Sequence, residues 1–137
     1  MKRILVVTTA GADEGWLAEP AAELAAETGA HVTVLAVDDV ESQRFATLPR
    51  DELLHSALAT AERLADAIGE RGADATAVAR SGAAVDAALA YADHIGADLL
   101  LVGSPRRRRV VDRLLGNLAV DLVRRSGRQV LAITEPE

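Results

Sequence analysis

The residues of this chain best suited to bind a ligand lie in one stretch near its end. An apolar run at 99–102 is followed by Gly103-Ser104, by the four arginines of 106–109, and by Gly116-Asn117. Glycines let a backbone approach an anion closely, and the N-terminus of a helix presents unpaired N–H groups to it. A helix is expected to begin at Leu118. This order of strand, glycine, basic loop, glycine and helix predicts a phosphate pocket.

The arginines at 106–109, together with Arg113, support two interpretations. As an anion clamp they would bind a polyphosphate, a nucleotide or RNA, because guanidinium groups pair bidentately with phosphate oxygens. As a solvated loop they would pair with acidic neighbours. We favour the solvated loop. RNA is the weakest of these ligands, since no aromatic residues are interleaved with the arginines.

Length and composition limit the class of protein. The chain has 137 residues, which fits one domain spanning 1–137, and a net charge of −6, which argues against a nucleic-acid binder. It has no cysteine, so disulfides and thiolate metal sites are excluded. No apolar run approaches the ~20 residues of a membrane span. The apolar start of the chain is interrupted by Thr8 and Thr9 and is interpreted as a strand, so we expect a cytoplasmic protein.

Strand-like and helix-like segments alternate along the chain. Strands are expected at 4–7, 31–37, 74–80, 99–102 and 129–134, and helices at 13–28, 49–71, 83–95 and 118–125. A polar connection is expected at 38–48, with Asp38-Asp39 solvated, and a turn at Ser81-Gly82. This alternation predicts an α/β fold, an open parallel sheet with helices on both faces. The continuous apolar runs at 4–7 and 99–102 place the first and fourth strands at its centre.

Ligands of such sheets bind at the carboxyl ends of the strands, where the winding direction reverses. That point lies between the first and fourth strands. The segments 8–11 and 103–106 are therefore expected to face each other across a crevice.

Three segments resemble the universal stress protein family: KRILVV at the start, LAVDD after the second strand, and ADLLLVGS…LLGNLAVDLVRRSGRQVLAI at the end. The family pattern is Gly-x-x-Gly, nine residues, then Gly-Ser or Gly-Thr. Gly103 and Gly116 match it with the right spacing. Arg106 stands at the second glycine, and Asn117 stands at the Ser or Thr. Thr9 stands where nucleotide-binding members carry an aspartate.

The resemblance implies a Rossmann-like, five-stranded parallel sheet in the order 3-2-1-4-5. It also implies a stress-response module that binds ATP or a related nucleotide, with or without Mg²⁺. The implied binding residues are Thr8, Thr9, Val37, Val102, Gly103, Ser104, Arg106, Gly116, Asn117 and Leu118. A homodimer is implied through the last strand, whose apolar VLAIT would otherwise be an exposed edge. The alternative is a dimeric member that binds no ATP and acts through protein partners.

The three departures from the family pattern have different physical consequences. Arg106 has a Cβ, which disfavours a glycine-like backbone, but its guanidinium could bind phosphate directly. Asn117 caps a helix about as well as serine. Thr9 lacks the carboxylate that would accept a hydrogen bond from a ribose hydroxyl. Val37 is matched to the position beside adenine, where only main-chain groups are needed.

Other chemistries find little support. His31, His55 and His94 show no metal-ligand spacing, and no Gly-x-Ser-x-Gly motif surrounds any serine. A response-regulator receiver would need a lysine after the fifth strand, and the only lysine is Lys2. Nothing supplies a general base, so no enzymatic activity is expected.

Overall fold

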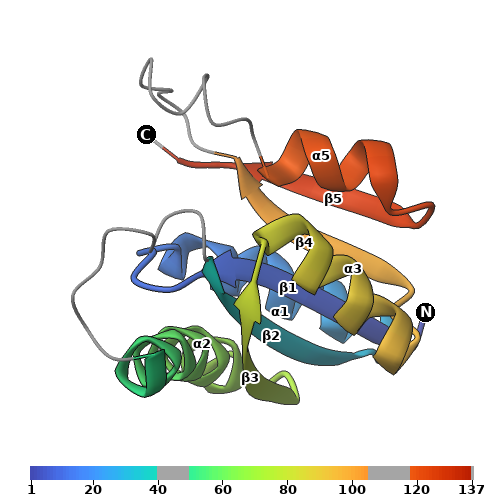
Figure 1. Ribbon diagram of the computed structural model, residues 1–137. Helices are drawn as coiled ribbons and strands as arrows, with labels where there is room; N and C mark the ends of the chain where they lie inside the picture. Colours follow the sequence, from blue (N-terminus) through green and yellow to red (C-terminus); the bar gives the residue numbers. More distant parts are fainter. Residues whose placement is uncertain (40–49, 105–117, 137) are drawn as a thin grey trace.

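The computed structural model describes residues 1–39, 50–104 and 118–136, and within them the chain forms a parallel sheet between two layers of helices (Figure 1). The strands are β1 (Arg3–Thr9), β2 (His31–Asp39), β3 (Ala75–Gly82), β4 (Leu99–Ser104) and β5 (Gln129–Thr134). The helices are η1 (Gly15–Leu17), α1 (Ala18–Thr28), α2 (Arg50–Glu70), α3 (Ala84–Ile95) and α5 (Leu118–Arg125). The sheet order, β3-β2-β1-β4-β5, confirms the prediction.

The centre of the sheet is formed by β1 and β4, as their apolar runs predict. Residues 4–7 and 99–102 are at most 3% exposed. Each fully buried Val, Leu or Ile side chain contributes about 1.5–3 kcal/mol through loss of apolar surface to water. Register pairs Val7 with Val102, so the two strands end at the same edge of the sheet.

Alternate residues of the strands serve two separate apolar clusters. Ile4 and Val6 pack on the face covered by α1 and α2, whereas Leu5 and Val7 pack on the face covered by α3 and α5 (Figure 1). Alanines form much of the helix surface that meets the sheet. The fully buried ones are Ala21, Ala57, Ala61, Ala88 and Ala92. These short side chains let the helix backbones lie close to the strands.

The helix ends follow the sequence signals. Gly29 ends α1 and Gly96 ends α3, both with left-handed backbones at φ 71° and 65°. Pro20 is the third residue of α1, where no intrahelical N–H bond is lost. The first helix begins later than expected, because the single 3₁₀ turn η1 precedes it. Among the described residues, no helix is both long and apolar enough to cross a bilayer.

Two polar segments expected outside the sheet lie within it. Ser81-Gly82 forms the end of β3 instead of a turn, and Asp38 lies in β2, only 2% exposed, instead of in a solvated connection. The cause is strand pairing, which continues to Asp38↔Ser81 and Asp39↔Gly82. The Ser81 hydroxyl donates to Asp38 Oδ2 at 3.2 Å. Gly103-Ser104 likewise belongs to β4, paired with the end of β5.

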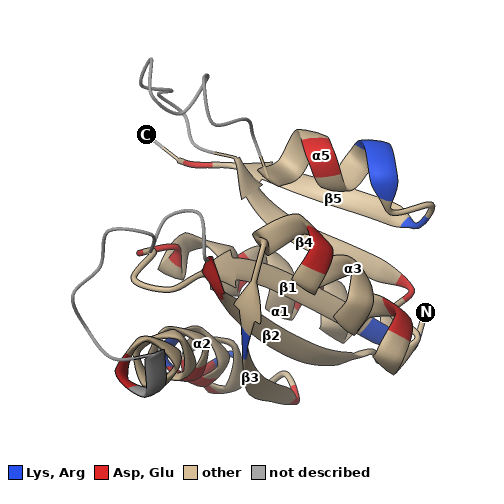
Figure 2. Ribbon diagram, viewed as in Figure 1, with Lys and Arg blue, Asp and Glu red and all other residues tan. Residues whose placement is uncertain are grey.

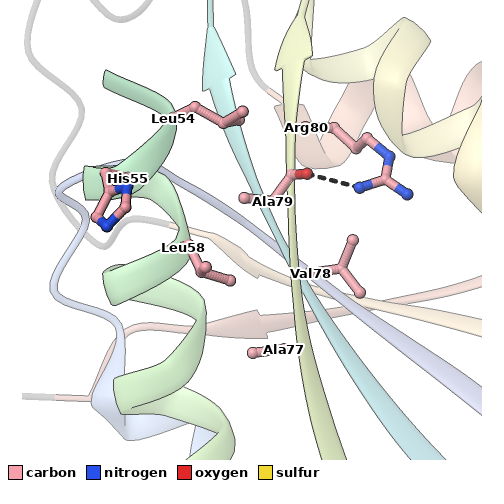
Figure 3. A pocket seen from close by; sticks show the side chains of 7 residues that line it. All are labelled: Leu54, His55, Leu58, Ala77, Val78, Ala79 and Arg80. Carbon is pink, nitrogen blue, oxygen red and sulfur yellow. Dashed lines mark hydrogen bonds between the residues drawn. The ribbon is translucent and has the colours of Figure 1, made fainter. Parts of the chain in front are cut away.

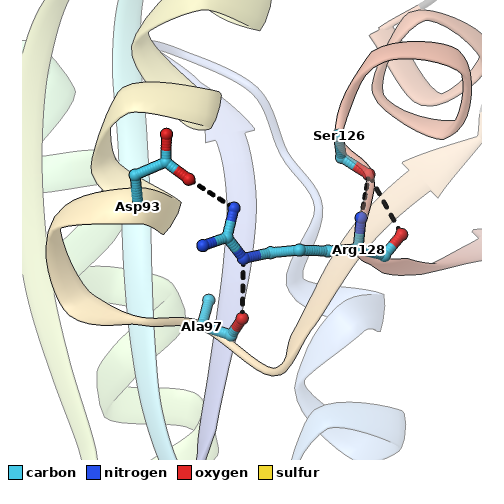
Figure 4. Close-up of polar contacts among 4 residues, drawn as sticks. All are labelled: Asp93, Ala97, Ser126 and Arg128. Carbon is cyan, nitrogen blue, oxygen red and sulfur yellow. Dashed lines mark hydrogen bonds and ion pairs between the residues drawn. The ribbon is translucent and has the colours of Figure 1, made fainter.

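Arg128 fastens the start of β5 to the end of α3 (Figure 4). Its Nε donates to the Ala97 carbonyl at 2.9 Å, and its Nη1 lies 2.5 Å from Asp93 Oδ1. Ser126 completes the turn, accepting from the Arg128 N–H at 3.1 Å and donating to its carbonyl at 3.0 Å. These contacts set where the last strand begins.

We expect Arg128→Ala to lower the free energy of unfolding by about 1–2 kcal/mol, because one partly buried hydrogen bond is lost together with a screened ion pair. Urea unfolding followed by circular dichroism measures this. Arg124→Ala, at an exposed position of α5, serves as the control and is expected to change stability by less than about 0.5 kcal/mol. Equal losses in the two variants would contradict the assigned role of Arg128.

Candidate functional site

The candidate site lies at the carboxyl ends of β1 and β4. β1 pairs with β2 on one side and with β4 on the other, so the winding direction reverses between β1 and β4. Thr8 and Gly103 follow the paired residues Val7 and Val102, and they are therefore neighbours at this edge. In open α/β sheets this is the position where ligands bind.

The chain turns sharply after β1 and returns over the end of the sheet. Gly11 takes a left-handed backbone at φ 80°, and its N–H donates to Thr60 Oγ1 on α2 at 2.9 Å. The Ala12 N–H donates to the Thr9 carbonyl at 3.1 Å. These bonds hold the loop against α2 and direct the residues that follow, including Glu14, back toward β1.

The Glu14 carboxyl is the polar centre of this edge. Its Oε1 accepts a hydrogen bond from Thr8 Oγ1 at 2.6 Å, and Thr8 itself is only 1% exposed. Both residues line a cavity of about 120 Å³ that also reaches Thr60 and Arg63 of α2. The loop after β1 therefore supplies a carboxylate to the place where a ligand would meet the strand ends.

Gly103 is required here for space. Its backbone does not lie in the left-handed region, so conformational freedom is not the reason for a glycine. A Cβ at this position would overlap Glu14 Oε2 and lie 2.8 Å from Trp16 Cη2. The close approach to the β4 backbone that the sequence predicts for a phosphate is thus made by the Glu14 carboxyl and the Trp16 ring.

Burial raises the pKa of Glu14 above its ordinary value of 4.5. The hydrogen bond from Thr8 acts in the opposite direction, and the nearby Glu135 carboxylate adds to the rise. Figure 2 shows further acidic positions on the loop after β1, at the end of β2 and after β5. In the described part of the chain, the carboxyl edge of β1, β2 and β5 is therefore acidic.

Several predicted binding residues lie together at this edge. Thr8 and Gly103 both lie against Glu14. Thr9 points to the opposite face of the sheet from Thr8. Val37 pairs with Thr9, and its carbonyl accepts from the Ala10 N–H at 3.0 Å. One lone pair of that carbonyl is thus already used by the sheet.

The remaining predicted residues are further from Glu14 or outside the described ranges. Val102 is buried, and the Ser104 carbonyl accepts from the Glu135 N–H at 2.9 Å. Leu118 begins α5 and packs on the α3 side of the sheet. The predictions for Arg106, Gly116 and Asn117 lie outside the described residues. No contact of these residues tests their binding role, which remains a prediction.

Sequence reasoning missed Glu14, Trp16 and the buried state of Asp38. Glu14 follows the expected aspartate position by five residues, and only the fold of the loop returns it to the strand end. The available signal was a lone Glu-Gly-Trp between an apolar strand and a helix. Asp38 Oδ1 is buried without a hydrogen-bond partner among the described residues. Such a group is costly, and pairing of β2 with β3 keeps it in place.

Two other cavities lie against β3. One of about 580 Å³ is lined by Leu54, His55 and Leu58 of α2 and by residues 77–80 (Figure 3). The Arg80 guanidinium donates to the Ala79 carbonyl at 2.8 Å there, so this carbonyl of the edge strand β3 already accepts a hydrogen bond. The other, of about 370 Å³, has Arg80 and the adjacent rings of Tyr91 and His94. Both lie away from the switch point.

The described residues contain no group of three or more His, Cys, Asp or Glu side chains able to hold a metal ion. The Mg²⁺ expectation thus has no dedicated ligand set in this part of the chain. A Mg²⁺ ion would have to be held largely by the phosphates of a nucleotide, as is usual for this ion.

The sheet and its crevice define the class of doubly wound α/β proteins with a ligand site at the switch point. The profile of the Universal stress protein family matches residues 1–134. The chain belongs to this family, as the glycine spacing predicts.

Several solved structures are similar to this chain in fold. A universal stress protein in complex with cAMP is 27% identical, with a TM-score of 0.72 and 97% of each chain covered. One from Archaeoglobus fulgidus in complex with dAMP is 20% identical, with a TM-score of 0.74 and 97% and 98% covered. A family protein from Burkholderia pseudomallei is 20% identical, with a TM-score of 0.66 and 95% and 94% covered. No curated protein matches the sequence.

The raised pKa of Glu14 has a consequence for stability. Between its unfolded and folded pKa values, the folded protein binds more protons than the unfolded chain, so the free energy of unfolding falls as the pH rises through this window. Glu14→Gln removes the charge and keeps an oxygen that can accept from Thr8. We expect the variant to unfold at a higher temperature than the parent at neutral pH. The difference should vanish below about pH 4.

Differential scanning fluorimetry across this pH range measures the effect. A variant that is less stable than the parent at neutral pH would show that the charged hydrogen bond from Thr8 outweighs the burial of the carboxylate.

Proposed function

We propose that the protein is a regulatory stress-response module that binds an adenine nucleotide at the carboxyl ends of β1 and β4 and does not turn it over. The observation that carries this proposal is the backbone of Gly103, approached by Glu14 and Trp16 from the loop after β1. The Thr8 hydroxyl and the Glu14 carboxyl supply hydrogen-bonding groups at this edge, and a glycine at 103 leaves room for Glu14 and Trp16 beside the β4 backbone.

The similarity to known structures supports an adenine nucleotide. The 27% identical universal stress protein is in complex with cAMP. In this chain the base would lie beside the Val37 main chain and the ribose near Thr9. The phosphate would approach Gly103 and Ser104, with Arg106, Gly116-Asn117 and Leu118 completing the site. ATP, with Mg²⁺ held by its phosphates, is the larger ligand that the family pattern implies.

A nucleotide that binds the folded protein must raise its unfolding temperature. We expect cAMP or ATP at 100 times its Kd to add about 2.7 kcal/mol to the free energy of unfolding. Gly103→Ala should abolish the shift, because the added methyl overlaps Glu14 and Trp16 and displaces them at the edge where the ligand would bind. Scanning fluorimetry and mass spectrometry of natively purified protein together test the proposal.

Gly69→Ala is the matched control, because nothing lies within 4 Å of a Cβ at this α2 position. It should retain the nucleotide shift. A parent protein that purifies without nucleotide and shows no shift with cAMP, ATP or AMP would overturn nucleotide binding. It would favour the member of the family that acts through protein partners alone.

We also propose a homodimer formed through β5. This strand is at the edge of the sheet, and among the described residues only Ile133 of its side chains packs against the core on the face of α1 and α2. Leu131 is consequently 40% exposed, and Val123 on the adjacent α5 is 57% exposed. An apolar, open edge strand is a template for pairing with a second chain. A cytoplasmic location would suit such a cysteine-free dimer.

We expect Leu131→Asp to convert the dimer to a monomer at micromolar concentration, because a carboxylate would be buried at the contact. Leu54→Asp is the matched control, since Leu54 is 39% exposed but lies on α2. Size-exclusion chromatography with light scattering gives the mass. A parent protein with the mass of one chain would contradict the dimer.

A further inference from the structure

The Glu14 carboxyl, a negative group of the chain itself, lies beside the β4 backbone at the candidate site. The Glu14 carboxyl is bonded to Thr8 at 2.6 Å through one oxygen, and its other oxygen lies where a Cβ of Gly103 would be. Trp16 Cη2 lies 2.8 Å from the same point. A ligand that approaches Gly103 from the side of its missing Cβ therefore meets Glu14 and Trp16.

Three charged groups of the described residues face Glu14. Glu135 follows β5, and its N–H bond to the Ser104 carbonyl at 2.9 Å keeps it beside the end of β4. Asp13 precedes Glu14 in the same loop, and Arg63 reaches the shared cavity from α2. Of these three groups, the Glu135 carboxylate acts on Glu14 as a like charge and raises its pKa.

A phosphate brought to Gly103 adds a negative charge within a few ångströms of this partly buried carboxylate. Like charges at such a distance repel strongly where water is displaced. The repulsion is relieved when Glu14 takes up a proton. An uncharged nucleoside meets no such repulsion, whether Glu14 is charged or protonated.

We propose that Glu14 is the specificity-determining residue of the crevice, favouring an uncharged nucleoside at neutral pH and coupling the binding of a phosphate-bearing nucleotide to the uptake of one proton. This inference rests on the proposed function, because it concerns the same site. Burial and the Glu135 carboxylate already raise the pKa of Glu14, which makes that uptake easier.

Adenosine and cAMP are suitable probes, because they share the base and the ribose ring, and only cAMP carries a charge, on a phosphodiester that does not titrate near neutrality. Isothermal titration calorimetry in buffers of different ionisation enthalpy measures both affinity and proton uptake. For the parent protein, we expect cAMP to bind about tenfold more tightly at about pH 5.5 than at about pH 8, with proton uptake. Adenosine affinity should stay constant.

Glu14→Gln should bind cAMP about tenfold more tightly than the parent at about pH 8, without proton uptake or pH dependence. Its adenosine affinity should change little. Glu23→Gln makes the same chemical change at an exposed position of α1 and should behave as the parent.

Trp16, the only tryptophan of the chain, provides a second readout without any ligand. Its ring lies beside the Glu14 carboxyl, so its fluorescence should titrate with a midpoint above 4.5 in the parent. This transition should be absent in Glu14→Gln and retained in Glu23→Gln. It also shows that the variant is folded, because the emission of a partly buried tryptophan differs from that of an unfolded chain.

The outcomes separate this inference from the proposed function. If adenosine and cAMP both bind, but cAMP affinity is independent of pH or Glu14→Gln changes both ligands equally, the role of Glu14 is overturned while nucleotide binding stands. If neither ligand binds the parent or Glu14→Gln at any pH, nucleotide binding fails and the inference fails with it. Tighter cAMP binding by Glu14→Gln than by the parent at about pH 8, together with binding by the parent at about pH 5.5, supports both.

Discussion

The structure depends on the parallel pairing of β1 with β4. Four residues of each strand are almost completely buried, and each strand is covered on both faces. This pairing joins the two halves of the sheet, because β2 and β3 extend from β1 and β5 extends from β4. It also brings Thr8 to Gly103, although 94 residues separate them in sequence. The crevice is therefore a direct result of the core, since the loop that follows β1 has to leave from the edge where β4 ends.

The core that holds these strands consists of aliphatic strands and alanine-rich helices. Aromatic residues make up only 2% of the chain, so stability comes from close helix–sheet contact more than from large side chains. One consequence is incomplete coverage of the sheet. α1 and α2 cover one face, but β5 keeps Leu131 exposed on that side. Because Leu131 stays exposed on this side of the sheet, the last strand is suited to contact with another chain.

Glu14 is an exception to the apolar character of the centre. Placing a carboxylate against Gly103 and Trp16 opposes the hydrophobic packing around it, and the hydrogen bond from Thr8 offsets only part of that cost. Polar groups held against such a cost occur often at functional sites. In the site proposed here, charge would therefore be the property that separates one ligand from another.

The sequence by itself determined the fold class and the family, because hydrophobic period, glycine stops and glycine spacing are local signals, and the resemblance to the family then implied the strand order. It identified β1 and β4 as central through their apolar runs, and it located Gly29 and Gly96 as helix ends. Only the tertiary structure decided which polar groups are buried. Asp38 is drawn into β2 by pairing with β3, and Glu14 is returned to β1 by the bond between Gly11 and Thr60. Both depend on contacts between segments far apart in the chain, which no local pattern encodes.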